Sequence, residues 1–134
     1  MTMDVHVFVG AFPSHEAACL YTEAQWEPEP DEGVSDEEYR IWEDRNPSWL
    51  MRAELKDPYL DSDFIETIDG PNRYSYLADM LTESGAIDQI RSTASDDDNI
   101  LVLIFSEALG GFTAQITSTT RLKYCGCFDC DLGD

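Results

Sequence analysis

The sequence predicts an α+β fold in which one small antiparallel sheet packs against helices. Two apolar runs rich in β-branched residues, at 5–9 and 100–105, have the length and composition of buried strands. Between them apolar residues recur at helical spacing, and after them turn signals alternate with short apolar runs. We therefore expect a single domain over 1–134, with an N-terminal strand, a helical middle and a C-terminal three-stranded antiparallel meander.

The first two predicted elements are a strand and a helix that follows it directly. The strand at 5–9 (VHVFV) ends at a Gly-x-x-Pro sequence, and Ser14 is suited to cap a helix over residues 15–26. The residues at positions i, i+3, i+4 and i+7 give this helix an apolar face, which consists of Ala17, Leu20, Tyr21 and Ala24.

A proline-rich acidic loop at 27–33 precedes a second helix. Ser35 and Glu38 have the spacing of a capping box, and acids fill the first turn, as the helix dipole favours. This helix should stop where the sequence reaches Asn-Pro. A third, short helix is expected at 48–55, with Trp49 facing the core.

The second half of the chain contains further helical and strand signals. The stretch at 57–69 fits either an extended segment or the lead into a helix. A helix capped by Asn72 or Ser75 follows, and Gly85 is suited to the position just after its end. The acidic stretch at 92–99 is expected to be a loop.

The meander is predicted from three apolar runs that lie close together in the sequence. The run at 100–105 is the clearest strand of the chain, and Gly110 and the glycine after it indicate a turn. Strands at 112–117 and 121–128 should complete the meander.

The charge of the chain excludes several classes of partner. Lys and Arg number 8, Asp and Glu number 28, and the net charge is −20, although 43% of the residues are hydrophobic. Phosphates repel such a protein, so we expect neither nucleic acid nor an anionic membrane as partner. No apolar run approaches the roughly 20 residues that span a bilayer. The first residues also lack the basic segment of a signal peptide, so we expect cytoplasmic residence.

The acids are concentrated in the segment 27–69, which holds 15 acidic residues against four basic ones. The same segment carries aromatic side chains, and an aromatic anchor within an acidic field suits a basic protein partner. The alternative is that the acids form a solvated coat over buried aromatics. The residues expected to bind the partner are Glu37, Trp42, Glu43, Asp44, Trp49, Asp61, Asp63 and Glu66, with Trp42 or Trp49 as the anchor.

The cysteines offer a different function, as a small metal-binding protein or an enzyme. Cys125, Cys127 and Cys130 could bind zinc if another residue supplied a fourth ligand. If 121–128 is a strand, however, Cys125 and Cys127 share one face and serve as small core residues. We expect reduced thiols without metal and no cofactor. Catalysis is not expected, because neither histidine lies in a recognisable nucleophile elbow.

Three segments of the chain resemble the bacterial immunity protein 22 family. The opening VHVFVGAFPSHEAACLYTE resembles that family's first strand, Gly-x-Phe turn and acidic helix. The run YLDSDFIE, at 59–66, resembles its central Tyr–acid–Asp–Phe–Ile–Glu motif, and LKYCGCF, at 122–128, resembles its closing strand. The Trp- and Pro-rich segment 27–49 and the cysteines depart from the family, so the choice of partner does not carry over. The matching positions in the opening are Gly10, Phe12, Ser14, Glu16 and Tyr21.

The resemblance implies a non-enzymatic antitoxin, which neutralises a toxin domain made by the same cell or a sibling cell. Many such toxins are nucleases with basic substrate grooves, which an acidic protein can block by mimicking phosphates. A DNA-mimicking inhibitor of host nucleases or restriction systems is physically similar but has a different partner. It stays open as an alternative.

Overall fold

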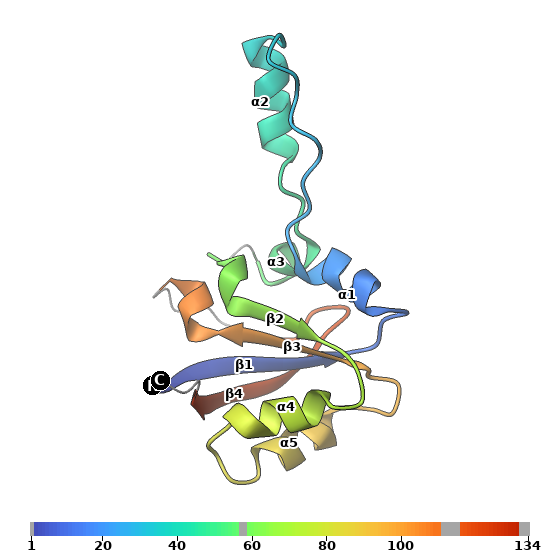
Figure 1. The fold of residues 1–134 in the computed structure, drawn as a ribbon, viewed down its shortest axis with the longest axis vertical. Coiled ribbons are helices and arrows are strands. Elements are labelled where there is room, and N and C mark those ends of the chain that lie inside the picture. Colours follow the sequence, from blue (N-terminus) through green and yellow to red (C-terminus); the bar gives the residue numbers. More distant parts are fainter. Residues whose placement is uncertain (1, 57–58, 111–115, 132–134) are drawn as a thin grey trace.

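A computed structural model describes residues 2–56, 59–110 and 116–131, and these residues form an α+β fold (Figure 1). The described strands are β1 (Thr2–Gly10), β2 (Ile65–Ile68), β3 (Ile100–Phe105) and β4 (Lys123–Asp131). The described α-helices are α1 (His15–Thr22), α2 (Asp36–Arg45), α3 (Leu50–Glu54), α4 (Arg73–Met80) and α5 (Ala86–Thr93). Two short 3-10 helices are η1 (Ser62–Phe64) and η2 (Ser106–Leu109).

The described strands make one antiparallel sheet in the order β2-β3-β1-β4. Val5 of β1 lies opposite Phe105 of β3 on one side and opposite Phe128 of β4 on the other. Every residue of β3 is buried, as its continuous apolar run predicts. The reason is that helices cover both faces of the sheet, α1 and α3 on one face and α4 and α5 on the other (Figure 1).

The alternation of side chains along β1 divides the core into two parts. Val5, Val7 and Val9 pack among buried residues of α4 and α5. Phe8 points to the other face, where it belongs to a cluster with Met51 of α3. Because each such side chain contributes roughly 1.5–3 kcal/mol when it is buried, the two clusters supply most of the stabilisation of the sheet.

The predicted C-terminal meander is wrong. The place between β3 and β4, which the meander assigns to the strand at 112–117, is occupied by β1, and β2 lies on the other side of β3. Of the strand predicted at 112–117, residues 112–115 lie outside the described part, and Ile116 and Thr117 are in no strand. The prediction failed because neighbouring apolar runs often pair, whereas here β3 pairs with the start of the chain.

The first helix is shorter than predicted. It ends at Thr22 rather than near Trp26, because Glu23 is already extended. Its predicted cap is confirmed, since the Ser14 hydroxyl accepts a hydrogen bond of 3.0 Å from a backbone N–H in the first turn. Leu20, expected on the buried face, is 57% exposed. The buried residues of the helix are Ala18, Tyr21 and Thr22.

Gly85 begins a helix instead of ending one. The preceding helix α4 stops at Met80, and Leu81 after it is extended. Gly85 has a φ of 82° and directly precedes α5, which extends into the stretch predicted to be a loop at 92–99. This helix was missed because its segment, AIDQIRST, is short and mostly polar; its buried residues are Ala86 and Ile90.

A β-bulge interrupts the alternation of β4. Consecutive residues of β1 lie opposite Gly126 and Tyr124, so Cys125 between them has no partner of its own. Gly126 has a φ of 134°, which residues with a side chain rarely adopt. The prediction that Cys125 and Cys127 share a face is therefore wrong, because Cys125 is buried and Cys127 is exposed.

Residues 26–47 form an arm that projects away from the sheet and carries α2 (Figure 1). At its base the backbones of Gln25 and Ser48 exchange two hydrogen bonds of 2.8 Å. The predicted cap of α2 is confirmed, because the Ser35 hydroxyl accepts from the N–H of Glu38 at 3.2 Å. The structure describes the whole of α2, and none of its residues is buried.

Candidate functional site

Three aromatic side chains of the arm pack against one another. Trp42 lies between Tyr39 and Trp26, with ring centroids 5.6 and 6.1 Å apart. The indole N–H of Trp42 donates to the carbonyl of Glu27 at 3.3 Å, and the hydroxyl of Tyr39 donates to the carboxylate of Glu29 at 2.9 Å. Each aromatic pair contributes about 0.5–1.5 kcal/mol beyond its buried area. The indole of Trp42, predicted to be an anchor for a partner, is therefore engaged within the arm.

Polar contacts fasten the C-terminal end of α2 to the segment that leads into the arm. The guanidinium of Arg45 donates two hydrogen bonds of 3.1 and 3.2 Å to the carboxylate of Glu27. The side chain of Asn46 donates to the carbonyl of Trp42 at 2.8 Å and accepts from the N–H of Glu27 at 2.7 Å. The exposed ion pair adds only about 0–1 kcal/mol to stability. The geometry of the arm is therefore set mainly by the packing of its rings and by the hydrogen bonds of the Asn46 side chain.

The arm carries a dense negative charge. Its acidic residues number nine and oppose Arg40 and Arg45. Because the arm projects from the sheet, its field reaches solvent on several sides and attracts cationic surfaces. The nine acids are Glu27, Glu29, Asp31, Glu32, Asp36, Glu37, Glu38, Glu43 and Asp44.

The structure divides the eight predicted partner-binding residues among three locations. Four lie on the arm, three lie in or beside η1 and β2, and one packs against the core next to α3. Figure 1 places α2 far from β2, so the arm and sheet groups are not one continuous patch. The residues on the arm are Glu37, Trp42, Glu43 and Asp44. Those in or beside η1 and β2 are Asp61, Asp63 and Glu66, and the residue next to α3 is Trp49.

The predicted residues outside the arm make contacts that support the fold. Trp49 packs against the core, and its indole N–H donates to a backbone carbonyl of α1 at 2.7 Å. The carboxylate of Asp61 caps η1 by accepting from the N–H of Asp63 at 3.0 Å. Glu66 accepts a hydrogen bond of 2.9 Å from Tyr76, and burial together with this carboxylate raises the pKa of Tyr76 to about 12.

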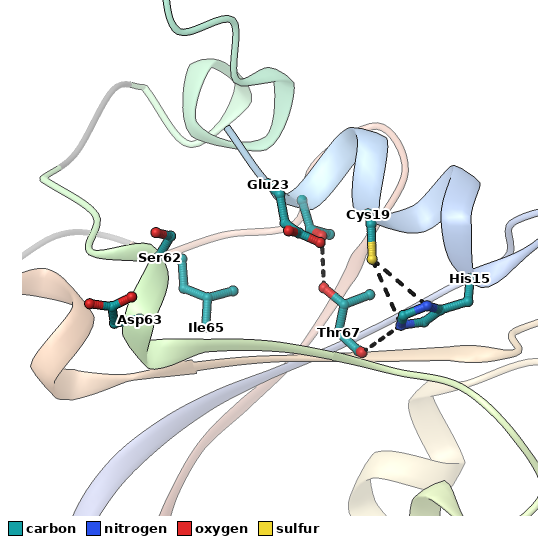
Figure 2. A pocket seen from close by; sticks show the side chains of 8 residues that line it. His15, Cys19, Glu23, Ser62, Asp63, Ile65 and Thr67 are labelled. Atoms are coloured by element: carbon teal, nitrogen blue, oxygen red, sulfur yellow. Dashed lines mark hydrogen bonds between the residues drawn. The ribbon is translucent and has the colours of Figure 1, made fainter. Parts of the chain in front are cut away.

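A pocket of about 350 Å³ lies between α1, η1 and β2 (Figure 2). Within it, Nε2 of His15 donates to the carbonyl of Thr67 at 3.0 Å, and Sγ of Cys19 lies 3.7 Å from the same nitrogen. Burial, then the hydrogen bond and charge of Glu23, raise the pKa of Cys19 to about 11. A nucleophilic cysteine needs the opposite shift, so this pair is not an activated dyad. The i, i+4 spacing of the two residues on a predicted helix is the signal that could have revealed their contact.

The C-terminal cysteines behave as small residues of a strand. Sγ of Cys130 donates to the carbonyl of Met3 at 3.2 Å, and Cys125 lies in the cluster covered by α4 and α5. Within the described ranges, no group of three His, Cys, Asp or Glu side chains is placed to hold a metal ion. The described part of the chain therefore offers no geometry for the predicted alternative of a zinc site.

We expect the thiols to react slowly with iodoacetamide at about pH 8. Burial raises the pKa of Cys125 to about 11, and partial desolvation, with the charges of Asp4 and Glu83, raises that of the more exposed Cys127 above its usual value. Since the thiolate is the reacting form, most of each group is unreactive below its pKa, and the rate should rise with pH. Mass spectrometry of the alkylated native protein, with glutathione as the reference thiol, measures this. Labelling of Cys125 as fast as glutathione at that pH would contradict the burial described above.

Comparison of the chain with models of known families, with curated proteins and with solved structures found no match. A separate observation is that none of the described helices is both long and apolar enough to cross a membrane. The most distinctive feature of the surface of this molecule is the exposed acidic arm.

Proposed function

We propose that this chain is a non-enzymatic immunity protein, which binds and neutralises a bacterial toxin domain that has a basic surface. The observation that carries the proposal is the arm at 26–47. It is exposed, strongly acidic and held in shape by its own rings and hydrogen bonds. No residue of α2 belongs to either core cluster, so the helix contributes an exposed surface instead of core packing.

Neutralisation of this kind requires no chemistry. A toxin that cleaves nucleic acid needs a basic groove, and an acidic element that occupies the groove prevents the substrate from entering. The net charge of −20 would accelerate the encounter by attracting the groove over several ångströms. For a nuclease toxin, the place of action would be the cytoplasm of the producing cell.

The proposal is tested by co-expressing the chain with the toxin domain encoded beside its gene. We expect the cells to survive only when the chain is present, and we expect the two purified proteins to form a stable complex by size-exclusion chromatography. A toxin domain from an unrelated system, chosen for a similar net charge, is the control and should not be neutralised. Absence of both protection and complex formation would refute the proposal. Inhibition of a restriction nuclease instead would favour the DNA-mimic alternative.

A further inference from the structure

The helix α2 has two faces with different roles. Tyr39 and Trp42 lie on the inner face, which packs against the segment leading into the arm. Glu37, Ile41 and Asp44 follow at i, i+4 and i+7, so they share the opposite face. All three are exposed, and Ile41 is 50% exposed. The outer face of α2, as we name these three residues, thus places an apolar side chain between two carboxylates.

On the basis of the proposed function, we propose that the outer face of α2 enters the basic cleft of a folded toxin domain, with Ile41 as its apolar anchor. Glu37 and Asp44 then face Lys or Arg side chains on the walls of the cleft. An α-helix with its side chains is about 10–12 Å across, so a cleft that accommodates a nucleic-acid backbone has a suitable width.

The arrangement of the outer face supports Ile41 as the anchor rather than Trp42. The energetic centre of an interface is an apolar side chain that becomes fully desolvated, surrounded by groups that complement the partner. Trp42 contacts two rings, donates its N–H and is only partly exposed, so it offers a partner less free surface than an exposed residue of the outer face does. Ile41 is half exposed, and carboxylates lie one helical turn away on either side.

Charge complementarity selects a basic protein as the occupant. A second copy of the chain would bring another −20 charge against this surface, and the two acidic helices would repel each other. Nucleic acid is repelled for the same reason. A cationic cleft can form ion pairs with both carboxylates of the outer face. The apolar stems of its Lys and Arg side chains can also pack against Ile41.

The test measures the dissociation constant for the purified toxin domain encoded beside this chain's gene. Ile41→Asp and the double variant Glu37→Lys/Asp44→Lys should each weaken binding on the order of tenfold or more. The control for the first is Leu20→Asp, which changes a similarly exposed side chain on α1. The control for the second is Asp79→Lys/Asp88→Lys, which makes the same change in net charge on α4 and α5. Both controls should stay within about threefold of the unchanged protein.

The outcomes separate this inference from the proposed function. Circular dichroism checks the helix content of each variant, and Ile41→Ala removes the side chain while favouring the helix. If the unchanged protein binds and all three outer-face variants bind equally well, the outer face is not the interface, and the proposed function still stands. Loss of binding in Asp63→Lys alone would move the interface to η1. If the unchanged protein does not bind, the proposed function fails.

Discussion

Replacement of Phe8 by alanine is expected to lower the free energy of unfolding by about 3–5 kcal/mol. Phe8 is fully buried in β1, where it lies opposite Val102 of β3 and Tyr124 of β4. Its ring centroid lies 5.2 Å from that of Tyr124. The strands on both sides are fixed by backbone hydrogen bonds and cannot close the cavity, so the lost contacts are not replaced. Urea denaturation followed by circular dichroism measures the change.

The control for this prediction is Leu20→Ala, a truncation at a site that is 57% exposed. It should change the free energy of unfolding by no more than about 0.5 kcal/mol. A cost below about 1 kcal/mol for Phe8→Ala would mean that the face of β1 toward α1 and α3 is not a packed core.

The local elements were predictable where a single physical signal decides them. The strand at 100–105 is a continuous apolar run, the strand at 5–9 is rich in valine, and the caps at Ser14 and Ser35 each satisfy a backbone N–H at a helix start. The pairing of strands was not predictable in this way. Strand β2 has only four residues, within a stretch whose pattern fitted two conformations, and its place beside β3 depends on contacts between distant segments.

The candidate site was predicted in composition but not in shape. The sequence has acids and aromatic residues together at 27–69, whereas the structure divides the predicted residues among the arm, the region of η1 and β2, and the core next to α3. Helical spacing alone cannot distinguish an apolar stripe that packs on a sheet from one that packs on the adjoining loop, as Tyr39 and Trp42 do. The bulge at Gly126 was missed for a similar reason, because strict alternation was assumed along the whole of β4.

We expect association with the toxin domain to slow steeply as salt is added. The chain carries a net charge of −20, and nine of its acids, opposed by two arginines, lie on an arm that projects into solvent, so the arm should attract a basic cleft before contact is made. Salt shortens the range of this attraction to about 10 Å at 0.1 M. The association rate constant should therefore fall by about 10–100-fold between low and physiological ionic strength, while the dissociation rate constant changes much less. Stopped-flow fluorescence, with the tryptophans of the chain as the probe, measures both constants.

The double variant Glu37→Lys/Asp44→Lys separates steering by the arm from steering by the whole molecule. Its net charge rises to −16, so a field spread evenly over the protein would weaken only slightly, and the slope of rate against salt would barely change. If the arm provides the attraction, the dependence of the association rate constant on salt should be clearly weaker in Glu37→Lys/Asp44→Lys than in Asp79→Lys/Asp88→Lys. Both double variants have the same net charge. An association rate constant that is indifferent to salt in the unchanged protein would remove electrostatic steering from the mechanism. Binding would then depend on contacts such as that of Ile41, which form after the encounter.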